Sequence, residues 1–244
     1  MGTYEMMVVQ STSLTNHCEN QYSDGDRARQ RAETFIKGAI EESTSHTVNF
    51  LTPSGDMYAP QQEIQGSFDA KYPCDRTFTI NYDNLLQYFD DWLDCVEEKR
   101  AADANIIITD TNDSDGGLAY GCGDYSGLGG ARTGQGIAQA SWSYETHGYD
   151  FEHTAVHTLL EELGHILLNC NTTDGDGDGI YDHDSGKIDF RDSGNTISPM
   201  SIDDIEGDNA CEKYNNCNRS WWCDTVDGWS LYFADCATDE FKSP

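Results

Sequence analysis

The sequence predicts a folded core of the α/β or α+β class, and three neighbouring segments support this. A β-branched run, NIIIT (105–109), is suited to a central strand. A long amphipathic helix is predicted just before it, within 84–102, and an alternating strand, TFTINY (77–82), precedes that helix. The order strand, helix, strand is typical of both classes. Aromatic residues make up 11% of the 244 residues, which argues against intrinsic disorder.

Earlier segments show the same two patterns. A helix is predicted over residues 27–40, where one face carries Ala28, Ala32, Phe35, Ile36, Ala39 and Ile40. A short strand, HTVNFL (46–51), follows and ends at the turn residues TPSGD. The strand over residues 77–82 ends at Asp83, which we expect to be the N-cap of the next helix. The apolar face of that helix is formed by Leu85, Phe89, Trp92, Leu93 and Val96.

The middle of the chain changes in composition. Residues 111–136 are rich in Gly and Asp, match no phosphate-binding loop, and are predicted to be loop and edge-strand material with bulges. IAQASWSY (137–144) alternates as a strand does, and a helix is predicted at about 151–169. We expect one catalytic-type domain over 1–244. Its N-terminal subdomain would span about 1–169, with the sheet and this helix, and its C-terminal subdomain about 170–244.

The charge balance is extreme, with 44 Asp+Glu against 14 Lys+Arg and a formal net charge of -30. The carboxylates are spread along the chain, so we expect a folded protein with an acidic surface. High salt screens such self-repulsion, which indicates a halophilic source. Nucleic acid is excluded as a partner, because phosphate binding needs clustered Lys and Arg.

The nine cysteines indicate an oxidising compartment. They lack paired C-x-x-C zinc-ribbon spacing, so we expect disulfides, with a connectivity that the sequence leaves open. No apolar run approaches the ~20 residues of a membrane helix. The start, MGTYEMMVVQ, lacks the features of a signal peptide. We expect a secreted, extracellular monomer whose export signal was removed, although an intracellular origin is equally compatible with this N-terminus.

The segment EELGH (161–165) carries the chemistry. It matches the helical zinc motif His-Glu-x-x-His except at its first position, Glu161. Residues four apart on a helix lie one above the other, so Glu161 and His165 can bind one metal ion. Glu162 turns toward the same open side, where it can accept a proton from an attacking water.

Two considerations leave alternatives open at this helix. An ordinary amphipathic helix would have the same leucine stripe, formed by Leu159, Leu160, Leu163, Leu167 and Leu168. Glu161 as an anionic ligand would also reduce the effective charge of the ion, which weakens its activation of water.

A calcium-like loop, DGDGDGIYD (174–182), follows the helix. The expected calcium ligands are Asp174, Asp176, Asp178, the carbonyl of Ile180, and Asp182. The full EF-hand pattern has Glu at place twelve, where this chain has Ser185. A solvated acidic turn is the alternative, but four carboxylates this close repel one another without a cation.

Two further segments make the pattern specific, DHDSG (182–186) and the turn SPMS (198–201). Together with EELGH, the preceding glycine-rich segment and an alternating strand, they resemble the metzincin-type zinc endopeptidases, in particular the snapalysin-like branch. The order of elements covers roughly residues 25–236. The resemblance implies a twisted mixed sheet with an active-site helix and a mostly irregular C-terminal subdomain.

Carried over to this chain, the resemblance implies that Glu162 is the general base, His165 a zinc ligand, and Met200 the hydrophobic floor beneath the metal. Glu161 stands where the family has its first histidine.

Two positions, His183 and Asp182, are open for the third zinc ligand. The family spacing places a glycine and this ligand where the chain has Leu168 and Asn171. If the calcium-like loop is an insertion, the third ligand moves to His183 or Asp182. We prefer His183, because Asp182 is already expected to be a ligand in the calcium-like loop.

The sequence therefore predicts a secreted, zinc-dependent and calcium-stabilised endopeptidase acting on a protein or peptide substrate. The resemblance implies that edge strand 137–144 aligns this substrate. Two alternatives stay open. A catalytically impaired relative, natural or made by substitution at Glu161, would serve as a binding or structural domain. An unrelated calcium-stabilised binding domain would contain EELGH by accident.

Overall fold

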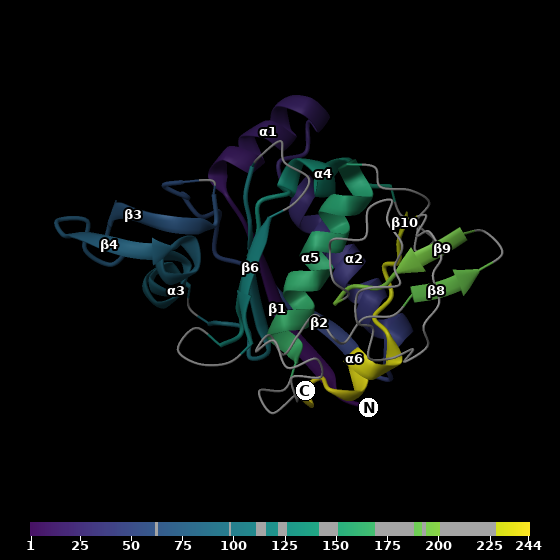
Figure 1. Ribbon diagram of the computed structural model, residues 1–244. Coiled ribbons are helices and arrows are strands. Elements are labelled where there is room, and N and C mark those ends of the chain that lie inside the picture. Colours follow the sequence, from purple (N-terminus) through teal and green to yellow (C-terminus); the bar gives the residue numbers. More distant parts are fainter. Residues whose placement is uncertain are drawn as a thin grey trace.

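The computed structural model describes residues 1–61, 63–97, 99–110, 116–121, 126–141, 151–168, 188–191, 194–200 and 228–244. For residues 188–191, 194–197, 228–229 and 236, only the backbone is described. The described residues form a mixed sheet with helices on both faces (Figure 1). This confirms the α/β class predicted from the sequence.

A five-stranded sheet in the order β2-β1-β5-β7-β6 forms the centre. Its strands are β1 (Thr3–Gln10), β2 (Thr47–Leu51), β5 (Ala104–Ile108), β6 (Gly117–Tyr120) and β7 (Leu128–Ala131). Four strands run parallel, and β6 lies antiparallel to β7 at the edge. Strand β5 is buried along its whole length, which explains its continuous β-branched run.

Two hydrophobic clusters lie on opposite faces of the sheet. Met6 and Val8 of β1 point into the first cluster, and Met7 and Val9 point into the second. The first is completed by α1 (Thr12–Tyr22), α2 (Arg27–Ser43), α4 (Gly134–Gln139) and α5 (Phe151–Leu167). The second is completed by α3 (Leu85–Val96) and the hairpin of β3 (Gln65–Lys71) and β4 (Thr79–Asn84) (Figure 1).

Several predicted elements are confirmed with small shifts. Helices α2, α3 and α5 and strands β2 and β5 lie where apolar periodicity placed them. The N-cap of α3 is Asn84 instead of Asp83, because the side chain of Asn84 accepts a hydrogen bond from the Gln87 amide at 3.1 Å. Residues 111–136 contain the edge strand β6, as expected, but they also contain β7, which lies inside the sheet between β5 and β6, and the start of helix α4.

The prediction of a strand over 137–144 is wrong where the structure describes it. Residues 137–139 belong to helix α4, in which Ile137 and Ala138 are both buried. An alternating strand would have pointed these neighbours to opposite faces. The edge strands of this sheet, as far as the structure describes it, are β2 and β6.

The C-terminal part contains a second sheet and ends in contact with helix α5. A second sheet, in the order β10-β9-β8, consists of β8 (Ile188–Arg191), β9 (Gly194–Ile197) and β10 (Gly228–Trp229). The short helix α6 (Asp235–Asp239) follows, and Phe241 then bridges to Leu168 at the end of α5. Within the described ranges, no helix combines the length and apolarity needed to span a bilayer.

One expected disulfide is present, between Cys74 and Cys95. It links the turn of the β3–β4 hairpin to the last turn of α3. Cys18 is a buried free thiol in the first hydrophobic cluster. The pairing of the remaining cysteines falls outside what the structure describes.

Candidate functional site

Helix α5 lies close to the sheet because the side chains beneath it are small. Gly117 and Ala119 of β6 are paired with Ala131 and Gly129 of β7, so small residues face α5 across both strands. A Cβ atom added at Gly129 would lie 2.7 Å from Cδ1 of Ile166 on α5. This close approach brings the EELGH segment directly over the edge strand.

The structure places the predicted zinc ligands Glu161 and His165 on consecutive turns of α5. Glu161 is only 5% exposed and His165 is half-buried. Glutamate is rarely this deeply buried unless it is paired or holds a cation. Carboxylate and imidazole are both donors that zinc accepts, so these two residues fit a zinc site.

The remaining predicted metal ligands lie outside the described residues. They are His183 and the calcium-loop positions Asp174, Asp176, Asp178, Ile180 and Asp182. Among the residues that the structure does describe, no group of three or more His, Cys, Asp and Glu side chains is arranged to hold a metal ion.

The predicted base, Glu162, is 8% exposed and lies against strand β6. A Cβ atom at Gly117 would overlap the Oε1 atom of Glu162, so only glycine leaves room for this carboxylate. The adjoining Gly116 has a φ of +111°, a conformation that L side chains rarely adopt. Sequence reasoning assigned Glu162 from motif spacing but did not identify Gly117 as its neighbour.

Met200 lies beneath the same helix. It is fully buried, and a Cβ atom at Gly164 would overlap its sulfur atom. The ring of Phe233 approaches the same point, with its Cε1 atom 3.2 Å from that position. Met200 has a φ of 72°, which is uncommon for a residue other than glycine. The fold therefore brings the predicted Met turn into contact with the EELGH helix.

The end of α5 is held by Lys242, which sequence reasoning missed. The Lys242 ammonium donates to the carbonyl of Ile166 at 3.1 Å and to that of Gly121, and its backbone amide donates to Leu167 at 2.8 Å. A cation at a helix C-terminus stabilises the exposed carbonyls there. Burial lowers the pKa of Lys242. A lone lysine near the chain end carries no sequence signal for this role.

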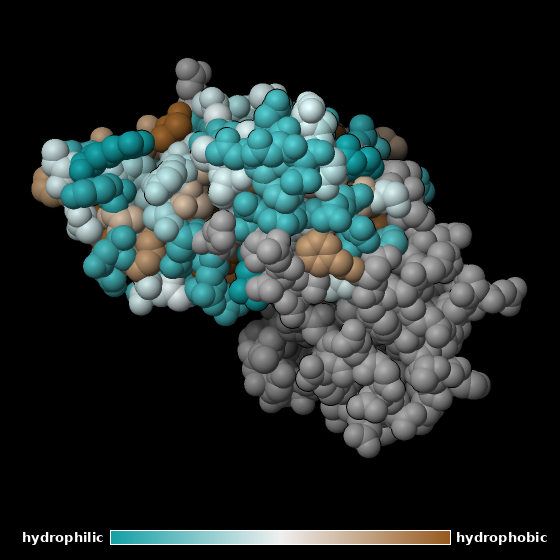
Figure 2. Space-filling view, turned by 90° about the horizontal axis from the view of Figure 1, so that it is seen from above, coloured by the Kyte–Doolittle hydropathy of each residue, from teal (hydrophilic) through white to brown (hydrophobic). Residues whose placement is uncertain are grey.

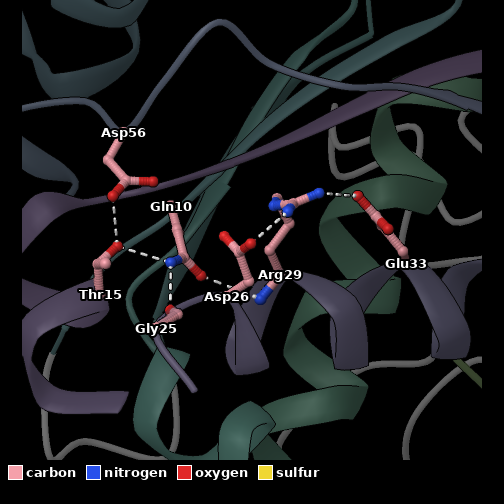
Figure 3. Close-up of polar contacts among 7 residues, drawn as sticks. All are labelled: Gln10, Thr15, Gly25, Asp26, Arg29, Glu33 and Asp56. Carbon is pink, nitrogen blue, oxygen red and sulfur yellow. Dashed lines mark hydrogen bonds and ion pairs between the residues drawn. The ribbon is translucent and has the colours of Figure 1, made fainter. Parts of the chain in front are cut away.

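A second polar cluster lies at the C-terminal end of β1 (Figure 3). The fully buried Gln10 donates to Thr15 and to the Gly25 carbonyl, both at 2.6 Å, and accepts from the Arg29 amide at 3.1 Å. Thr15 in turn donates to Asp56 at 2.7 Å. The bonds of Gln10 join β1 to α1, to the loop before α2 and to the first turn of α2, and Thr15 joins α1 to the loop after β2. The cluster therefore has a structural role.

The ion pairs at the edge of this cluster fit the same interpretation. Arg29 contacts Asp26 at 3.0 Å and Glu33 at 3.1 Å (Figure 3). Burial raises the pKa of Glu33, while Arg29 acts in the opposite direction. The seven residues drawn include neither histidine nor cysteine. The α5–β6 region thus remains the candidate site.

A scan against protein-family models and a search of curated proteins found no match to the chain.

Proposed function

We propose that the chain is a secreted zinc-dependent endopeptidase of the metzincin type. The observation that carries this proposal is the contact between Met200 and Gly164. These two residues come from separate partial motifs, SPMS and EELGH, and the fold packs one directly against the other. An accidental EELGH on a leucine-rich helix gives no reason for a buried methionine turn beneath it.

The architecture gives further support. The resemblance implies a mixed sheet with an active-site helix beside an edge strand, and α5 lies beside the antiparallel edge strand β6. Because residues 137–139 are helical, we assign the alignment of a peptide substrate to β6 instead.

In this proposal Glu161 and His165 hold zinc together with His183 or Asp182, and the loop at 174–182 holds calcium. Bound zinc would acidify the attacking water and polarise the peptide carbonyl. Glu162 accepts the proton from that water and then donates it to the leaving amine. The floor of small residues on β6 and β7 keeps the Glu162 carboxylate close to the strand that aligns the substrate.

Glu161 itself favours a second candidate, a catalytically impaired relative that uses the same region between α5 and β6 for binding. A carboxylate at the first ligand position offsets part of the ion's charge, so the attacking water would be less acidified. Such a protein would keep the fold and the calcium loop without hydrolysing peptides.

Zinc content and casein cleavage distinguish these candidates. The protein would be purified in high salt, its zinc and calcium measured by mass spectrometry, and casein cleavage assayed with and without a chelator. We expect near one zinc per chain and chelator-sensitive cleavage. Glu162→Gln should retain zinc and lose about 100-fold or more of the cleavage rate, because it removes the general base alone.

Glu161→His provides the matched comparison. If the chain with Glu161 holds no zinc and cleaves nothing, while Glu161→His gains both, the chain is an impaired relative. If even Glu161→His holds no zinc, the zinc site itself is wrong.

A further inference from the structure

The pairing of β6 with β7 determines which backbone groups of β6 face its free edge. The Arg132 amide donates to the Gly116 carbonyl at 3.0 Å, and hydrogen-bonded pairs alternate along an antiparallel ladder. The backbone groups of Leu118 and Tyr120 therefore point toward β7. Those of Gly117, Ala119 and Gly121 point toward the open edge, since β6 is the outermost strand of this sheet in the described part of the chain.

Side chains cover two of these three outward carbonyls. Gln65 donates from Nε2 to the Gly117 carbonyl at 3.1 Å. The Gly121 carbonyl accepts from Lys242 Nζ and also from the Ser126 hydroxyl at 2.8 Å. Ala119 lies between the two. Proteins use side chains in this way to limit pairing along an exposed strand edge.

The side chains of Gln65 and Lys242, which bind these carbonyls, differ in how easily a peptide could displace them. Lys242 is half-buried and also binds the Ile166 carbonyl, so displacing it would disrupt the end of α5. Gln65 is exposed and lies at the start of β3 on the other side of the strand. An exposed amide of this kind exchanges readily with water or with another donor. Of the two, Gln65 is the one that an incoming peptide can replace.

Gly117 connects this edge to the proposed chemistry. Its carbonyl binds Gln65, while its Cα lies against the carboxylate of Glu162. A peptide amide that took the place of Gln65 would therefore be fixed next to the proposed base.

We propose that Gln65 is a positioning residue that competes with an extended peptide for the Gly117 carbonyl. With Gln65 in place, the Ala119 carbonyl is the one of these three outward carbonyls that the side chains named above leave open to an added strand. When Gln65 leaves, the paired segment lengthens by one hydrogen bond toward Glu162. This inference rests on the proposed function, because it assumes a peptide ligand on β6.

The test measures binding without chemistry. Fluorescein-labelled casein would be titrated against Glu162→Gln, and against Glu162→Gln combined with Gln65→Ala, by fluorescence anisotropy. Removing the competing amide should tighten the Kd about three- to tenfold, the range expected for one hydrogen bond. In the cleaving enzyme, the same change should fall on KM rather than on kcat.

Gln61→Ala is the matched control. Gln61 also donates its side-chain amide to a glycine carbonyl at 3.0 Å, but that carbonyl belongs to Gly66 of β3 and not to β6. We expect its Kd and KM to equal those of the parent. A loss specific to hairpin stability would affect both glutamine variants, whereas competition at the edge affects Gln65 alone.

The inference is overturned if Gln65→Ala leaves casein binding unchanged or weakens it, or if no variant binds casein. Zinc-dependent cleavage with no effect of Gln65 would leave the peptidase proposal standing alone. Tighter binding by Gln65→Ala, with no cleavage even by Glu161→His, would leave the edge site standing and reject the peptidase proposal.

Discussion

At the residue scale, Gly164 decides how the two motif segments meet. Glycine in a helix interior is less favourable than alanine by about 1 kcal/mol, so a helical glycine calls for a packing reason. Here the reason is the Met200 sulfur, which occupies the place of a side chain at position 164. Gly117 plays the equivalent part for Glu162 on the facing strand. The lack of a side chain at Gly164 and at Gly117 thus leaves room for Met200 and Glu162 in the candidate site.

Gly164→Ala should therefore destabilise the protein despite its higher helix propensity. We expect a loss of about 1–3 kcal/mol in the free energy of unfolding, because the added methyl group overlaps a fully buried side chain. Urea unfolding at a fixed high salt concentration would measure it.

Gly55→Ala is the matched control, since a Cβ atom there meets nothing within 4 Å. Its effect should stay within about 0.5 kcal/mol. A Gly164→Ala protein as stable as the parent would show that Met200 does not pack beneath α5.

At the element scale, α5 depends on the C-terminal tail for its end. The carbonyls of the last helical turn have no amide partners within the helix. The tail supplies donors for two of them, the backbone amide and the side-chain ammonium of Lys242. The Lys242 carbonyl also accepts a hydrogen bond from the Tyr4 hydroxyl at 2.6 Å, which ties the tail to β1. One residue thus joins α5, β6 and the interior of the sheet.

Lys242→Met keeps the length of the side chain and removes its donors. We expect it to lower the free energy of unfolding by about 1–3 kcal/mol, because carbonyls of Ile166 and Gly121 lose a charged donor in a half-buried place. Thermal or urea unfolding would measure the loss. Lys37→Met, at an exposed lysine 3.9 Å from Glu41, should change stability by less than about 0.5 kcal/mol. Equal effects of the two variants would contradict this role for Lys242.

At the level of single elements, apolar periodicity predicted the helices whose buried face is visible in their own sequence. Helices α2, α3 and α5 have apolar faces that the sequence alone displays. Strand β1 was not predicted, because its apolar run, residues 6–9, is short and follows Glu5, which is paired with Lys99 at 2.7 Å. The strand predicted at 137–144 was wrong at residues 137–139, where the neighbours Ile137 and Ala138 are both buried in α4, so tertiary packing overrode the local alternation there.

The site divides in the same way. The placement of Glu161, Glu162 and His165 on one helix could be predicted because helical spacing is local, and Met200 was assigned through the resemblance. Gln65 and Lys242 were missed because each donates to a backbone carbonyl, 52 and 121 residues away respectively. Contacts to the backbone leave no pattern of residue types in the sequence, so only the fold reveals them.

At the scale of the whole molecule, the charge imbalance dominates. Hydrophilic residues cover much of the described surface on the face shown in Figure 2. With 44 acidic and 14 basic residues, most carboxylates have no Lys or Arg available to pair with. The available cations are shared, and Arg100 binds both Asp90 and Asp94 at 2.6 Å. Mutual repulsion of the remaining carboxylates opposes the compact state.

Salt should therefore stabilise the fold by screening that repulsion. Raising NaCl from about 0.1 M to about 2 M shortens the Debye length from about 10 Å to below 3 Å. We expect Tm to rise by at least about 5 °C, equivalent to about 1–2 kcal/mol for a domain of this size. Differential scanning calorimetry at neutral pH would measure it. Sucrose at matched water activity is the control, because it favours compact states without screening charge. If sucrose raised Tm as much as NaCl, preferential exclusion would explain the effect, and the acidic surface would not require salt.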